Sequence, residues 1–115
     1  MTSPAQINEL HNNAMELAGQ ALHADLHGDY AGAKSLFKDA FDLERQAALL
    51  VVPDANAEPT RSILLRSAAT LAVDCHEFKE AERLIAIALS GTPPAEIAEE
   101  LRDLSVNGLC YEIWP

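Results

Sequence analysis

Two histidines, His23 and His27, have the spacing in this sequence that best fits metal chemistry. Because they stand four residues apart in a helical stretch, their imidazoles share one face and could bind one metal ion. A third ligand would have to come from elsewhere, and His76 is the candidate. Alanine follows His23, so the glutamate of helical metalloprotease motifs is missing. Two exposed histidines near a helix C-terminus, where positive charge is favourable, explain the pattern more simply. We expect no metal site.

Three other patterns resemble known chemical sites, but we expect neither catalysis nor a cofactor from them. Residues 28–35, Gly-Asp-Tyr-Ala-Gly-Ala-Lys-Ser, partly match a phosphate-binding loop, but the spacer is short and a helix, not a strand, precedes it. We interpret this segment as a turn between helices. Cys75 and Cys110 lie far apart, and Cys75 falls on an apolar helix face, as a small core residue does. Arg66 and His76 are too widely spaced for the Arg–His pair of helical ribonuclease domains.

Composition favours an all-α fold for this chain of 115 residues, which has room for one domain, 1–115. Alanine and leucine are the commonest residues and only 5% are aromatic, which argues against a β-sandwich or barrel. The net charge of −10 disfavours binding to nucleic acid or an anionic membrane. No secretory signal or bilayer-length apolar run is visible, so we expect a cytoplasmic protein. The acidic excess fits either simple solubility or a preference for basic partners.

Cap and turn signals divide the chain into about five helices, and short connections make neighbouring helices antiparallel. The last residues, 109–115, form an apolar and aromatic tail. The first helix lies between Ser3-Pro4 and His27-Gly28, the second runs from Asp29 or Tyr30 to about Leu50, and the third runs from Pro59 to about His76. The fourth ends at Ser90-Gly91, and the fifth lies between Thr92-Pro93-Pro94 and Asn107-Gly108.

A spacing pattern of the first two helices returns 48 residues later in the next two. Small residues at a helix crossing let two backbones approach, and a large residue four positions on fills the space beside them. The pattern consists of Gly28, Tyr30, Ala33, Phe37 and Ala40, and its second copy of His76, Phe78, Ala81, Ile85 and Ala88.

This pattern resembles the tetratricopeptide repeat (TPR), with Pro93 where that family's closing proline falls. Over residues 61–104 the chain is also similar to small stand-alone bacterial TPR-type proteins. The departures are Arg45 at the first proline position, His76 in place of the turn glycine, and a period of 48 rather than about 34. The resemblance implies helix pairs stacked as a short right-handed superhelix: pairs at 14–51 and 59–91, a capping helix at 92–108 and the tail. An ordinary four- or five-helix bundle is the alternative.

The resemblance also implies a concave groove lined by the first helix of each pair. The implied groove is mostly apolar, and only Arg66 stands at a position of the family's basic peptide clamp. We therefore expect a non-catalytic interaction module that binds a hydrophobic, helical segment of a protein or peptide. The implied partner-binding residues are Met15, Ala18, Leu22, Asp25, Leu26, Ile63, Arg66, Thr70, Val73 and Asp74.

Two other functions stay open. Two repeats are fewer than the three usually needed for stability, so a second copy of the chain could supply the missing burial. The protein would then be a small homodimeric bundle that acts as a structural or regulatory accessory subunit. The tail could instead pack on the chain's own groove. A third possibility is a metal protein or enzyme that uses His23, His27 and His76.

Overall fold

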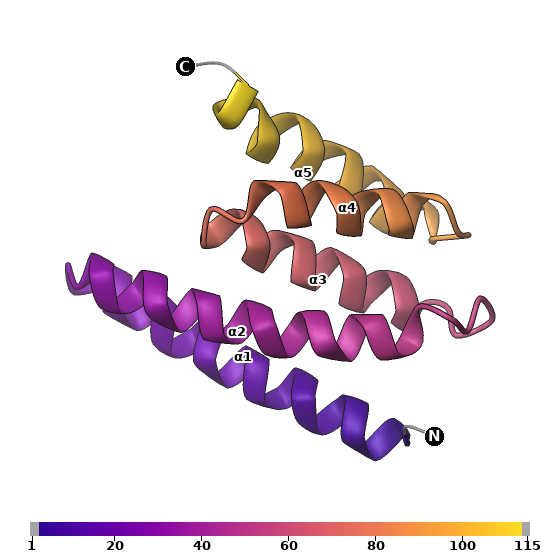
Figure 1. Cartoon of the computed structure of the whole chain (residues 1–115), viewed down its shortest axis with the longest axis horizontal. Helices are drawn as coiled ribbons and strands as arrows, with labels where there is room; N and C mark the ends of the chain where they lie inside the picture. The colour runs from indigo at the N-terminus through magenta and orange to yellow at the C-terminus, as the bar shows by residue number, and fades with distance from the viewer. Residues whose placement is uncertain (1–2, 114–115) are drawn as a thin grey trace.

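The computed structural model describes the backbone of residues 3–113 and the side chains of residues 3–105. All regular structure in that range is helical, which confirms the predicted all-α class and the number of helices (Figure 1). No helix of residues 3–113 combines the length and the apolar character needed to cross a bilayer. The helices are α1 (Pro4–Leu26), α2 (Tyr30–Val51), α3 (Thr60–Asp74), α4 (Phe78–Leu89) and α5 (Ala95–Ile113).

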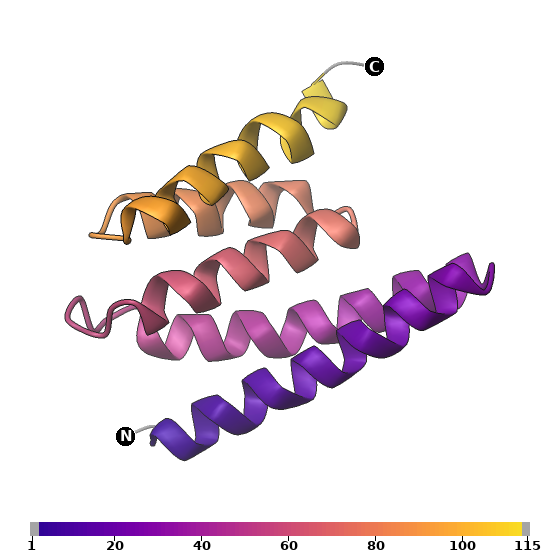
Figure 2. The ribbon, with the colours of Figure 1, turned by 180° about the vertical axis from the view of Figure 1, so that it is seen from behind.

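The helices form two layers. Figure 2 shows α1, α3 and α5 side by side nearest the viewer, with α2 and α4 behind them. The described part of the chain measures 42 × 34 × 21 Å, and its thinnest dimension is about two helix diameters. Each helix packs against the next one along the chain, and α3 also packs against α5. Helix α1 differs from the others of its layer, because its close packing is with α2 alone.

Local cap chemistry explains where the first two helices begin. The Ser3 hydroxyl accepts a hydrogen bond from the Gln6 N–H (3.3 Å), and the Ser3 N–H donates to the Gln6 side chain (2.9 Å). Together these two bonds form a capping box. The Asp29 carboxylate accepts from the Gly32 N–H (3.0 Å) and caps α2. Residues 28–35 are therefore an inter-helix turn and the start of α2, as predicted.

The turns α1–α2 and α3–α4 have the same backbone geometry. Gly28 and His76 both adopt positive φ, +80° and +63°. The N–H of the next residue donates back to Ala24 O (2.9 Å) in the first turn and to Ala72 O (2.7 Å) in the second. Both are Schellman motifs, which satisfy the last carbonyls of a helix through one left-handed residue. The two copies of the sequence pattern thus share a turn even though histidine replaces glycine in the second.

The core follows the predicted alanine seams. Ala40, Ala68, Ala72 and Ala88 are fully buried where α2, α3 and α4 pack together. Large side chains fill the space between these small residues, because close backbone approach at the seams leaves gaps beside them. The largest fully buried apolar side chains are Phe41, Leu65, Leu84 and Leu101.

The loop between α2 and α3, residues 52–59, contains two prolines, Pro53 and Pro59. Pro59 precedes α3 as its N-cap residue. The Glu58 carboxylate accepts hydrogen bonds from the Ser62 N–H (2.9 Å) and the Ser62 hydroxyl (2.7 Å), and so satisfies the start of α3.

The predicted end of the fifth helix is wrong. Helix α5 passes through Asn107-Gly108 and continues to Ile113, so residues 109–113 are not a separate tail. A single glycine inside a helix costs only about 1 kcal/mol relative to alanine, which is too little to end a helix by itself. Residues 114 and 115 and the side chains from residue 106 on lie outside the described part, and with them the predicted packing of the tail.

Candidate interaction surface

Of the three histidines singled out for metal chemistry, two are neighbours on α1 and the third lies in a different turn. His23 and His27 are exposed at the end of α1, with ring centroids 4.2 Å apart, and His27 Nδ1 lies 2.8 Å from the His23 carbonyl oxygen. His76 lies in the α3–α4 turn, stacked on Phe78. Within the described residues, no group of three His, Cys, Asp or Glu side chains is placed to hold a metal ion.

Cys75 is buried at the end of α3, as its position on an apolar face predicted. Its thiol donates to the Ala72 carbonyl at 3.6 Å. Burial raises the pKa of the Cys75 thiol above its ordinary value, so the protonated form predominates at neutral pH. A protonated, buried thiol is a poor nucleophile.

The ten sequence-predicted binding residues occupy two helices of one layer, but the structure does not bring the two rows into contact. On α1, Met15, Leu22, Asp25 and Leu26 are exposed and Ala18 is half-buried. On α3, the polar Thr70 and Asp74 are exposed, whereas Ile63, Arg66 and Val73 are half-buried. Helices α1 and α3 are not a closely packed pair, although they lie in the same layer (Figure 2).

Arg66, the expected clamp residue, already has a partner. Its Nη1 donates to Glu100 Oε2 on α5 at 2.9 Å, and the Thr70 hydroxyl donates to the Arg66 carbonyl. The ion pair joins α3 to α5. Asp74, further along α3, is partly desolvated, which raises the pKa of its carboxyl, and the charge of His76 opposes that shift.

A row of exposed apolar side chains marks the face of α1 that α2 does not cover. Met15 is 37% exposed, Leu22 56% and Leu26 84%. With the half-buried Ala18 they follow steps of three, four and four residues, which places them on one side of the helix. We call Met15, Ala18, Leu22 and Leu26 the α1 stripe. Monomeric proteins seldom leave such contiguous apolar surface open unless it binds something.

A hollow of about 950 Å³ lies at the other end of α1, between its first turns, the end of α2, the loop and the start of α3. A smaller hollow of about 400 Å³ adjoins it, and Leu50 lines both. We call the larger space the N-terminal hollow. It is lined by Pro4, Ile7, Asn8, Leu50, Val51, Pro53, Asp54, Ala57, Glu58 and Thr60.

The sequence predictions did not include this hollow, although one signal for it was present. Leu49, Leu50, Val51 and Val52 form an apolar run that covers all sides of the last turn of α2. A helix that packs through one face cannot bury such a run completely. Leu49 and Leu50 accordingly stay 43% and 42% exposed.

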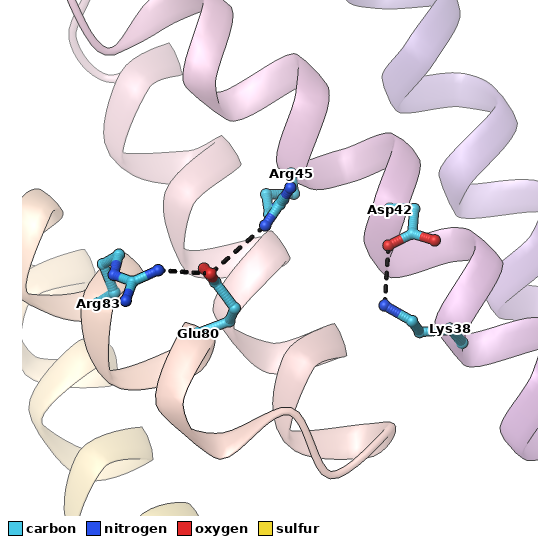
Figure 3. Close-up of polar contacts among 5 residues, drawn as sticks. All are labelled: Lys38, Asp42, Arg45, Glu80 and Arg83. Carbon is cyan, nitrogen blue, oxygen red and sulfur yellow. Dashed lines mark hydrogen bonds and ion pairs between the residues drawn. The ribbon is translucent and has the colours of Figure 1, made fainter.

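Basic side chains are concentrated on α2 and α4, where an equal number of acidic side chains balances them. Helix α1 contains no lysine or arginine, whereas α2 and α4 carry Lys34, Lys38, Arg45, Lys79 and Arg83. Several of these are paired: Arg45 and Arg83 flank the Glu80 carboxylate at 3.4 and 2.6 Å, and Lys38 meets Asp42 at 3.1 Å (Figure 3). The hydrogen bond to Asp42 raises the pKa of Lys38.

A contact between His11 and Glu44 joins α1 to α2. Glu44 of α2 is fully buried, and His11 Nδ1 lies 2.9 and 2.8 Å from its two carboxylate oxygens. The two residues are 33 positions apart, so no local motif reveals their contact. Burial of a carboxylate is tolerated only when a hydrogen-bond donor reaches it, and His11 supplies that donor.

The comparisons with known proteins add no relative: no family model matches the chain, and no curated protein and no solved structure matches it either.

Proposed function

We propose that the protein is a non-catalytic interaction module that binds an apolar, helical segment of a partner protein along the face formed by α1 and α3. The observation that carries the proposal is the α1 stripe, whose large side chains are more than one-third exposed on a helix covered from one side only. An amphipathic partner helix could bury this stripe in the manner of other helix-in-groove complexes.

The TPR resemblance supports the same face. In that family the first helix of each pair lines the binding surface, and here α1 and α3 lie in one layer with α2 and α4 behind them (Figure 2). The shared Schellman turns agree with two copies of one structural unit. In the proposed complex the apolar contacts come from Met15, Leu22 and Leu26, and Asp25 and Asp74 orient the polar side of the partner.

Site-specific photo-cross-linking in the expressing cells tests this proposal. A benzoylphenylalanine at position 22 should capture a partner, whereas one at Ala86, exposed on α4 in the other layer, should not. The Leu22→Asp variant should lose that partner and Ala86→Asp should keep it. Equal capture from both positions, or an unchanged partner in Leu22→Asp, would refute binding at this face.

The role of Arg66 needs a separate variant because its side chain also joins α3 to α5. Arg66→Glu alone would break the contact with Glu100. The exchange Arg66→Glu with Glu100→Arg keeps an ion pair between the helices and reverses the charge at position 66. Loss of the partner in the exchanged variant, with an unchanged melting temperature, assigns Arg66 to the binding surface.

Self-association is the second candidate function, and the exposed end of the α1–α2 hairpin favours it. Leu26 and Tyr30, 84% and 69% exposed, lie on either side of that turn. Two copies packed through this end would bury both side chains and form a homodimeric accessory subunit. Light scattering at millimolar concentration tests it: a dimer mass lost in Leu26→Asp supports it, and a monomer mass refutes it.

A further inference from the structure

The N-terminal hollow combines an apolar floor with an acidic rim. Ile7, Leu50 and Val51 supply apolar surface from α1 and α2, and Leu50 lines both the larger and the smaller hollow. Apolar side chains could therefore be placed on both sides of Leu50. The larger space, about 950 Å³, is in the range of sites that enclose ligands or several side chains.

Three carboxylates line the two hollows. Asp54 and Glu58 line the larger hollow and Glu9 lines the smaller one. The Glu58 carboxylate accepts from Ser62 and the Asp54 carboxylate accepts from the Asn56 N–H at 3.0 Å, while Glu9 and Asp54 are both exposed. The first 33 residues and residues 46–60 contain no lysine or arginine. The rim therefore presents negative charge to a ligand.

The nearest arginine in sequence does not line the hollow. Arg61 is only 7% exposed, and its Nε donates to the Val52 carbonyl at 3.0 Å. Its Nη1 lies beside Gly91, so close that a Cβ added there would be 2.6 Å away. The guanidinium thus faces the turn after α4 and is not among the groups that line the hollow.

We propose that the N-terminal hollow binds a cationic amphipathic helix, with apolar side chains on either side of Leu50 and lysine or arginine side chains toward Glu9 and Asp54. This inference rests on the proposed function, since it presumes a partner segment, and it adds the charge of that segment and its anchoring point. At this acidic rim a second copy of the chain fits poorly, because its own acidic side chains outnumber its lysines and arginines 18 to 8. The end of α5 lies at the opposite corner of the fold from the N-terminus (Figure 1).

A fluorescent leucine–lysine peptide about 14 residues long, designed as an amphipathic helix of about four turns, is the probe. Fluorescence anisotropy should show saturable one-to-one binding that weakens with added salt, because screening reduces charge attraction. The same peptide with glutamate in place of lysine should not bind. Absence of saturable binding by the leucine–lysine peptide would overturn the inference.

Variants separate the hollow from general attraction to an acidic protein. Leu50→Ser should weaken binding about tenfold, since it removes one leucine-sized apolar contact. Glu9→Gln with Asp54→Asn should weaken binding about fivefold at low salt. The matched control, Asp39→Asn with Glu82→Gln on α2 and α4, changes the net charge equally and should leave binding unchanged. Equal weakening by both pairs of charge variants would refute the site.

The same titration distinguishes this inference from the proposed function. If Leu22→Asp abolishes peptide binding while Leu50→Ser has no effect, the α1 stripe binds helices and the hollow does not. If Leu50→Ser alone weakens binding, the hollow is the anchoring point. Circular dichroism of each variant shows that the fold is intact, so a loss of binding is not a loss of structure.

Discussion

Replacement of His11 by alanine should destabilise the protein far more than its partial exposure indicates. The imidazole is one-third exposed, but it is the hydrogen-bond donor for the fully buried carboxylate of Glu44. His11→Ala would leave that carboxylate in the interior without this partner. The general cost of removing one member of a buried pair is about 3–5 kcal/mol.

The expected loss lies at the lower end of that range. Truncation of a side chain that already reaches the surface opens a path for water to Glu44, and hydration recovers part of the cost. We expect a fall of about 3 kcal/mol in the free energy of unfolding. For a chain of this size, that corresponds to a decrease of about 12 °C in melting temperature.

Urea denaturation followed by far-ultraviolet circular dichroism measures this difference. His23→Ala is the matched control, because it removes an exposed histidine from the same helix, and it should change stability by no more than about 0.5 kcal/mol. His11→Ala combined with Glu44→Leu should recover most of the loss, since the buried charge is then replaced by apolar volume. A cost below about 1 kcal/mol for His11→Ala would refute the reasoning, because Glu44 would then have another source of stabilisation.

Three further predictions concern the repeated turn and the residue before it. His76→Gly should raise the free energy of unfolding by about 0.5 kcal/mol. Glycine removes the strain of a positive φ, and this gain exceeds the cost of the greater chain entropy that glycine gives the unfolded state. A destabilised variant in thermal melts would contradict this. Glu77→Asp should raise the free energy of unfolding by about 1 kcal/mol, because aspartate can cap α4 as Asp29 caps α2. The control, Glu77→Gln, should leave the free energy of unfolding unchanged. Burial raises the pKa of Cys75, so the protonated thiol favours the folded state. This contribution to stability is fully present below the ordinary thiol pKa and is lost as the pH rises through the pKa that the thiol has in the folded protein. The test uses a variant in which the chain's other cysteine is replaced by serine. A disulfide reagent at alkaline pH should react with the Cys75 thiol more slowly in the folded protein than in urea, and equal rates would contradict its burial.

The helix boundaries were predictable where local chemistry sets them. Ser3 and Gln6 form their capping box within one turn, and Gly28 ends α1 through its own backbone freedom. His76 lacks that freedom, yet the spacing around it was sufficient to identify the equivalent turn. The end of α5 was mispredicted because Gly108 was given the weight of a stop signal that a single glycine does not carry.

The candidate surface was predictable only in part, because its features depend on distant pairs. The exposure of Leu22 and Leu26 follows from the periodicity of one helix, which the sequence displays. The contact of Arg66 with Glu100 joins residues 34 positions apart, and nothing local specifies it. The N-terminal hollow likewise requires residues 4–8 to meet residues 50–60, which lie more than 40 positions further along the chain.

The one-sided packing of α1 has a consequence for hydrogen exchange. Helix α3 is packed against α2, α4 and α5, whereas α1 is packed closely against α2 alone. Its amides should therefore exchange through a partial opening of lower free energy than the opening that exposes the amides of α3. A ligand seated on α1 would slow that exchange by mass action, even if no atom of the remaining helices moved. Deuterium uptake along α1 would thus report an occupied surface before the identity of its occupant is known, and uptake equal to that of α3 would show that the whole chain opens as one unit.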